Sequence, residues 1–128
     1  MFISLSGGPN IHRDYNIPKD ITFDVNDKNS QISIVLQGNP QPNISWMLDG
    51  AELINTEVSV LDERKKLFKY TSHINVRRNL HNKFINFTAE GYKKNQLTGG
   101  IRLNVICKCR QLLYHYFKCL LSVLLTKS

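Results

Sequence analysis

The residues best suited to chemistry in this sequence are three cysteines and a histidine close to its C-terminal end. They form the pattern Cys107-x-Cys109, followed by His115 and Cys119. Zinc is commonly bound by cysteine pairs with about two to four residues between them, so the one-residue gap is unfavourable for two ligands on one ion. The flanking basic residues are compatible with reactive or palmitoylated thiols, and ordinary free thiols are the simpler interpretation. The sequence therefore predicts no metal site and no cofactor.

Catalysis needs a nucleophile with a base, or paired carboxylates, held together by a scaffold. His73 and His81 have no serine or cysteine near them in a recognisable arrangement, and Asp49 belongs to a turn that ends in Gly50. We therefore expect each histidine to be a surface or edge residue. The sequence predicts a protein that is not an enzyme.

Two Asn-x-Ser/Thr triplets can accept N-linked glycans, at Asn43 and at Asn86. Each lies in a stretch where apolar and polar residues alternate, which places the following Ile44 and Phe87 inward and the two asparagines outward. A glycan would have room on that outer face. Such triplets also arise by chance in a chain rich in asparagine, so acceptors that are never used are the alternative.

Charge is distributed unevenly along the chain. Residues 1–62 carry three basic and eight acidic side chains, a balance of −5, whereas residues 63–128 carry fourteen basic and two acidic ones, a balance of +12. A positive region can attract a sulfated glycan or another acidic surface, or can simply keep a domain soluble. Nucleic acid is not expected, because neither interleaved exposed aromatics nor a reading motif is present. The candidate residues for an anionic partner are Arg64, Lys65, Lys66, Lys69, Arg77 and Arg78.

The elements that must position these side chains are strands. Alternation of apolar and polar residues predicts strands at 21–25, 31–37, 44–48, 68–76, 84–90 and 101–105, with a shorter edge strand around 58–60. No convincing helix precedes residue 107. About seven or eight short strands at regular spacing are typical of an all-β antiparallel sandwich, and 128 residues suffice for one such domain. Trp46, the single tryptophan, lies at the centre of one of these strands.

Three stretches carry a resemblance to immunoglobulin domains of the I-set type. Residues 38–50 contain G-x-P-x-P-x-I-x-W-x-x-D-G, which is similar to the strand B to strand C region of that family. The run FTA at 87–89 with Leu103-x-Val105 is similar to the F–G hairpin, and IPKD at 17–20 is similar to the strand A lead-in. The resemblance covers about residues 9–106 and implies an immunoglobulin-like β-sandwich.

The sequence departs from that family at the covalent link between the sheets. The family usually joins strands B and F by a disulfide, at positions that correspond here to Ile34 and Phe87. Its tyrosine two residues before the second cysteine corresponds to Ile85, so the tyrosine-corner hydrogen bond is expected to be absent. Burial of Ile34 and Phe87 on Trp46, at about 1.5–3 kcal/mol each, would offset much of the roughly 4 kcal/mol that such a crosslink contributes.

The predicted organisation is a flexible lead-in at 1–16, an immunoglobulin-like domain at 17–106 and an amphipathic or truncated tail at 107–128. Apolar residues recur at helical spacing within 111–125, which could associate with a membrane surface but is short of the roughly 20 residues that a membrane span needs. The opening MFISLSGG has no basic region and is a poor secretory signal. If the protein is extracellular, we expect this chain to be a fragment.

The resemblance implies a non-catalytic recognition module of a cell-surface or secreted adhesion or receptor protein. Such a module would bind a protein partner, which could be a second copy of itself, through sheet faces and loops. One alternative is a structural immunoglobulin domain of a cytoskeletal or muscle protein, which the missing disulfide favours and the glycan acceptors oppose. Another is a glycan-binding domain that uses the basic side.

Overall fold

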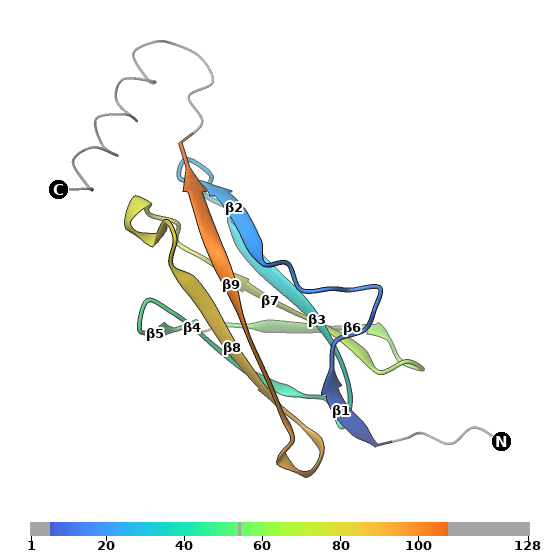
Figure 1. Cartoon of the computed structure of the whole chain (residues 1–128). Coiled ribbons are helices and arrows are strands. Elements are labelled where there is room, and N and C mark those ends of the chain that lie inside the picture. Colours follow the sequence, from blue (N-terminus) through green and yellow to red (C-terminus); the bar gives the residue numbers. More distant parts are fainter. Residues whose placement is uncertain (1–5, 54, 108–128) are drawn as a thin grey trace.

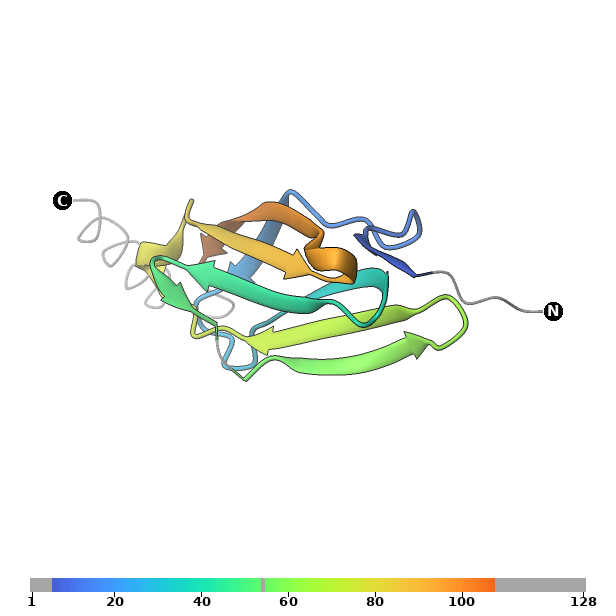
Figure 2. The ribbon, with the colours of Figure 1, turned by 90° about the horizontal axis from the view of Figure 1, so that it is seen from below.

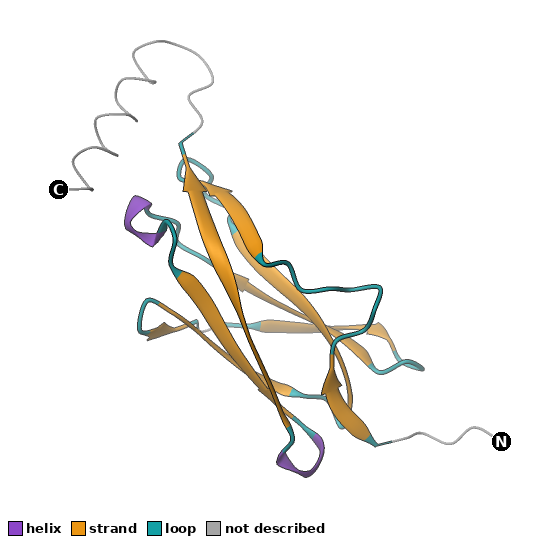
Figure 3. Cartoon of the chain, in the orientation of Figure 1, coloured by secondary structure: helices purple, strands orange, loops and turns teal. Residues whose placement is uncertain are grey.

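The structure is a computed structural model that describes residues 6–53 and 55–107 (Figure 1). The described part of the chain contains nine strands and two single-turn 3-10 helices (Figure 3). The strands are β1 (Gly7–Asn10), β2 (Asp20–Asp24), β3 (Gln31–Asn39), β4 (Asn43–Leu48), β5 (Ala51–Glu52), β6 (Glu57–Asp62), β7 (Leu67–His73), β8 (Phe84–Glu90) and β9 (Gln96–Ile106). The helices are η1 (Arg78–Leu80) and η2 (Tyr92–Lys94).

The strands form two sheets that lie face to face as two layers (Figure 2). One sheet has four strands in the order β1-β3-β7-β6, and the other has five in the order β2-β9-β8-β4-β5. In strands such as β3 and β8, buried side chains alternate with more exposed ones. This arrangement confirms the predicted all-β, immunoglobulin-like sandwich.

Two details of the predicted sandwich are wrong. It is not wholly antiparallel, because β2 pairs with β9 in parallel, from Asp20 beside Arg102 to Asp24 beside Ile106. The chain starts at the edge of the four-stranded sheet with β1 and then crosses to the five-stranded sheet as β2, which brings it alongside β9. The described residues also hold nine strands rather than seven or eight, since β1 and the two-residue β5 show no alternation of their own and are strands through their pairing with β3 and β4.

The flexible lead-in predicted for residues 1–16 is wrong for residues 7–10, which form β1 and pair with β3. Gly8 has φ +91°, and a Cβ there would lie 2.7 Å from the carbonyl oxygen of Gln37. Glycine therefore permits an approach of the two backbones that no other residue could make without a clash. Pro9 has no N–H to donate, which a strand at the edge of a sheet tolerates. The described domain accordingly begins near residue 7 and not at residue 17.

The core lies between the two sheets and surrounds Trp46. Ile34 of β3, Trp46 of β4 and Phe87 of β8 are all buried and belong to one apolar cluster. Trp46 stands directly beside Phe87 in the β4–β8 pair, whereas Ile34 comes from the opposite sheet. The indole N–H of Trp46 donates a hydrogen bond of 2.9 Å to the Thr56 hydroxyl, a partner that the sequence did not indicate. Both sheets thus contribute to the packing around this indole.

The ring of Phe87 is accommodated by a glycine on the neighbouring strand. Gly99 of β9 is the register partner of Phe87, and a Cβ built on it would lie 2.6 and 2.7 Å from two carbon atoms of the ring. Real side chains do not approach so closely, so the ring occupies the space that a side chain at position 99 would need. Phe87 and Gly99 therefore form a matched pair in the core.

A buried tyrosine connects the four-stranded sheet to the turn before β4. The hydroxyl of Tyr70, in β7, donates a hydrogen bond to the carbonyl oxygen of Pro42. Ile85 is buried in the core and has no hydroxyl, so the tyrosine-corner bond is absent and Tyr70 makes a different contact with the backbone. Burial raises the pKa of Tyr70 from 10.0 to about 12, because the phenolate would lose its hydration.

This tyrosine predicts an alkaline loss of stability. Because the folded-state pKa is the higher one, the unfolded chain ionises first, and stability falls by about 1.4 kcal/mol per pH unit once the pH exceeds 10. Below pH 10 the contribution is fully present. We expect the wild-type chain to lose at least about 1 kcal/mol more than Tyr70→Phe between roughly pH 9 and pH 11.5 in urea denaturation. Tyr92→Phe, which removes the hydroxyl of a half-buried tyrosine, is the control. Equal losses in wild type and Tyr70→Phe would contradict the assignment.

Candidate interaction surfaces

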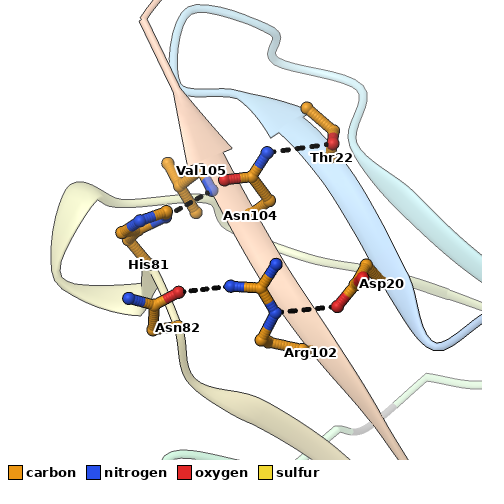
Figure 4. A network of polar contacts seen from close by, with 7 residues as sticks. All are labelled: Asp20, Thr22, His81, Asn82, Arg102, Asn104 and Val105. Atoms are coloured by element: carbon orange, nitrogen blue, oxygen red, sulfur yellow. Dashed lines mark hydrogen bonds and ion pairs between the residues drawn. The ribbon is translucent and has the colours of Figure 1, made fainter.

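The residues considered for catalysis occupy surface positions or make structural contacts. His73 is an exposed residue at the end of β7, and the Asp49 carboxylate lies 3.6 Å from the Lys83 ammonium in an ion pair. The His81 side chain binds the backbone of β9: its Nδ1 accepts a hydrogen bond of 3.0 Å from the Val105 N–H (Figure 4). Among the described residues no group of three metal-binding side chains occurs. None of these side chains forms part of a catalytic arrangement with another.

The surroundings of His81 fix the last part of β9. The Arg102 guanidinium extends between β2 and the turn after η1, donating from Nε to Asp20 at 2.7 Å and from Nη1 to the Asn82 amide oxygen at 2.6 Å (Figure 4). The Asn82 N–H in turn donates to the carbonyl oxygen of Leu103. These polar contacts hold both β2 and the turn after η1 to β9, so the charged Arg102 and Asp20 have a structural role.

The C-terminal motifs lie almost entirely outside the described residues. Cys107 is the last of the described residues, and it is a disulfide cysteine, so the free-thiol interpretation is wrong for it. Cys109, His115 and Cys119 lie outside the described ranges, as does the predicted membrane-associating stretch 111–125. Within residues 6–53 and 55–107, no helix is long and apolar enough to cross a membrane.

The structure divides the predicted basic set between two ends of one strand. Three of its residues lie in the turn between β6 and β7, and Lys69 is exposed on β7 itself. Arg77 and Arg78 follow the other end of β7, where η1 begins. The seven residues of β7 span roughly 20 Å, so the two groups cannot contact one small anionic group together. The residues of the β6–β7 turn are Arg64, Lys65 and Lys66.

Acidic residues share the β6–β7 turn with these cations. The Asp62 carboxylate accepts hydrogen bonds from the backbone N–H groups of Arg64 and Lys65, at 2.9 and 3.0 Å. The Lys66 ammonium lies 3.8 Å from the Glu63 carboxylate. The turn therefore presents charges of both signs instead of a purely positive surface.

Both glycan acceptors lie on the outer face of the five-stranded sheet. Asn43 is the first residue of β4 and stands opposite Glu90, and Asn86 lies in the middle of β8 between Met47 and Gly100. Both asparagines are exposed, in the outward orientation that the alternation predicts. Their cross-strand partners differ: those of Asn86 are Met47 and a glycine, whereas Asn43 faces the carboxylate of Glu90.

The edge strand β6 exposes a row of apolar side chains. Val58, Val60 and Leu61 are 43%, 52% and 43% exposed. Val58 and Val60 stand beside the buried Tyr70 and Phe68 of β7, so they point toward the interior side of the sheet. They are nevertheless exposed, because β5, the corresponding edge of the other sheet, is only two residues long. In the described part of the chain β6 pairs with β7 alone, and its other edge is open.

Comparison with known proteins yields structural relatives only. No family model matches the chain, and no curated protein matches its sequence. Among solved structures, the crystal structure of Rst D1-D2 is similar with a TM-score of 0.56 and 20% identity, over 69% of this chain and 45% of that one. A pair of tandem Ig domains of titin is similar with a TM-score of 0.55 and 16% identity, over 80% of this chain and 51% of that one.

This chain thus spans about half the length of each of those structures. Identities of this size show a shared fold and carry no statement about binding or activity. The I-set subtype stays a prediction from the sequence. Together with the two-layer topology, the similarity shows that the chain is an immunoglobulin-like β-sandwich domain.

Proposed function

We propose that this chain is a non-catalytic recognition module that binds a protein partner along β6. The observation that carries the proposal is the row of exposed apolar side chains on an open edge strand, formed by Val58, Val60 and Leu61. An extended segment can add to such an edge through main-chain hydrogen bonds while its side chains contact the exposed row. Soluble proteins usually protect long edges with lysine or proline, and β6 contains neither.

A second copy of the same chain is the partner that the charges favour. β6 begins with Glu57 and is followed by the basic residues Arg64 and Lys65. If two β6 strands pair antiparallel about a two-fold axis, Glu57 of each copy approaches Arg64 and Lys65 in the turn of the other, where Asp62 is bonded to backbone N–H groups and Glu63 to Lys66, and the two apolar rows lie side by side. A parallel arrangement would instead bring like charges together. The antiparallel pair therefore combines apolar contact with complementary charge.

The proposed interface predicts association that depends on Val60. We expect the wild-type chain to dimerise in sedimentation equilibrium at concentrations from about 1 to 200 μM, and Val60→Lys to weaken the dimer by at least about tenfold. Thr98→Lys, at an exposed position of β9 in the other sheet, is the matched control and should leave the dimer unchanged. A wild-type chain that stays monomeric throughout, or equal weakening by both lysines, would contradict the proposal.

The parent protein can be of two kinds. Exposed acceptors at Asn43 and Asn86 support a cell-surface or secreted adhesion or receptor protein. The apolar residues Ile34 and Phe87 in place of an inter-sheet disulfide support a structural domain of a cytoskeletal or muscle protein. The likeness to titin domains fits the second kind at least as well, although it concerns the fold alone. Both kinds can use β6, and a glycan on the native protein would decide for the first. Binding of sulfated glycans is the weaker alternative, because the basic set is divided.

A further inference from the structure

The outer face of the five-stranded sheet has an apolar spot centred on Asn86. Phe84, two residues earlier on the same face of β8, is 51% exposed, and Met47, directly opposite Asn86 on β4, is 44% exposed. On the other side Asn86 is the register partner of Gly100, which has no side chain. A Cβ built on Gly100 would lie 3.0 Å from the Asn86 amide oxygen and 3.7 Å from the Phe84 ring. Asn86 and Phe84 therefore lean over the same glycine.

We propose that Asn86 carries an N-linked glycan whose first N-acetylglucosamine packs against Phe84 and Met47. The triplet Asn86-Phe87-Thr88 provides the acceptor, and the exposed ring and thioether lie on either side of it. One face of a pyranose ring presents C–H groups, which pack favourably on an aromatic surface. Gly100, opposite Asn86 on β9, adds no side chain that would cover this apolar spot. The glycan would cover apolar surface that otherwise faces water.

The covalent step is an ordinary glycosyl transfer. The donor is an oligosaccharide linked to a lipid pyrophosphate, supplied with its transferase by the secretory pathway. The amide nitrogen of Asn86 forms a bond to the anomeric carbon of the donor while the bond from that carbon to the pyrophosphate oxygen breaks. The lipid pyrophosphate leaves with the electron pair, and the amide gives up one proton to a base of the transferase.

Asn43 provides an internal comparison within the same sheet. It stands opposite Glu90, and the next side chain on its face is that of Ser45, whose hydroxyl lies 3.4 Å from the Glu52 carboxylate. These neighbours are polar, in contrast to Phe84 and Met47 beside Asn86. The two acceptors therefore differ in what a glycan could contact, and the difference can be measured.

For the test, the full chain is expressed behind a secretory leader in animal cells. Peptide mass spectrometry then measures which fraction of Asn43 and of Asn86 carries a glycan, in retained as well as secreted protein. Glycans are then trimmed to a single N-acetylglucosamine and the melting temperature is measured. We expect Asn86 to be occupied and its sugar to raise the melting temperature by about 4 °C or more relative to Asn86→Gln. With Phe84→Ser in both members of that comparison, the increase should fall by at least about half.

Two further comparisons separate sugar packing from general effects. Phe84→Tyr keeps the ring, so the Asn86 sugar should still raise the melting temperature. A sugar at Asn43 is measured against Asn43→Gln, and any change that it causes in the melting temperature should be the same with Phe84→Ser. An Asn86 that stays unoccupied would overturn the proposal. So would an increase from the Asn86 sugar that is the same with phenylalanine and with serine at position 84.

Discussion

Replacing Trp46 with alanine is expected to lower the free energy of unfolding by about 3–5 kcal/mol. The indole is completely buried between the two sheets, and its N–H is bonded to the Thr56 hydroxyl, so the substitution opens a large cavity and leaves that hydroxyl without its partner. A typical domain is stable by only about 5–15 kcal/mol, which makes this a large share of the total. Urea or guanidinium denaturation of the purified chain measures the loss.

Two other substitutions show whether the loss comes from core packing. Met47→Ala changes the next residue of β4, which points outward, and should cost no more than about 0.5 kcal/mol. Trp46→Phe retains an aromatic ring but removes the N–H, so we expect an intermediate loss. Similar unfolding curves for Trp46→Ala and Met47→Ala would show that this indole is not the centre of the core.

Replacing Gly99 with valine is the second substitution with a large expected effect, a loss of about 2–3 kcal/mol in the free energy of unfolding. The new Cβ would meet the Phe87 ring at 2.6 Å, and the ring can withdraw only by displacing other core side chains. Gly7→Val is the control, because a Cβ on Gly7 has nothing within 4 Å. Chemical denaturation of both variants gives the comparison.

The clash can be isolated by shortening its other partner. Phe87→Val alone should destabilise the domain by leaving a cavity. The double variant Phe87→Val with Gly99→Val should lose at least about 1 kcal/mol less free energy of unfolding than the two single losses added together. The shorter side chain at position 87 frees the space that the valine at position 99 fills. Strict additivity would mean that the two residues do not compete for one volume.

Strands with regular alternation could be predicted from the sequence, and strands defined by long-range pairing could not. The bounds 84–90 expected for β8 are those of the structure, since half-buried strands carry a local period of two. β9 begins at Gln96, well before the strand expected at 101–105, because Gly99 and Gly100 give no alternation of their own. Their place in a strand follows from the Phe87 and Asn86 side chains beside them, which belong to another part of the chain.

The same limit applies to the surfaces. The outward orientation of Asn43 and Asn86 follows from alternation and could be predicted. The candidate basic residues are close in sequence, but β7 separates the group in the β6–β7 turn from Arg77 and Arg78. The exposure of Val60 depends on how short β5 is, a feature of the opposite sheet that no local pattern reports.

The parallel pairing of β2 with β9 has a mechanical consequence. The chain enters this pair at Asp20 and leaves it at Ile106, at opposite ends of two strands that lie side by side. A pull between Asp20 and Ile106 would slide β2 past β9 and load all the hydrogen bonds between them at once, instead of opening them one after another. The Arg102 guanidinium, bonded to Asp20 across the same pair, would take up part of that load. In this geometry the β2–β9 pair resists such a pull through all its hydrogen bonds together.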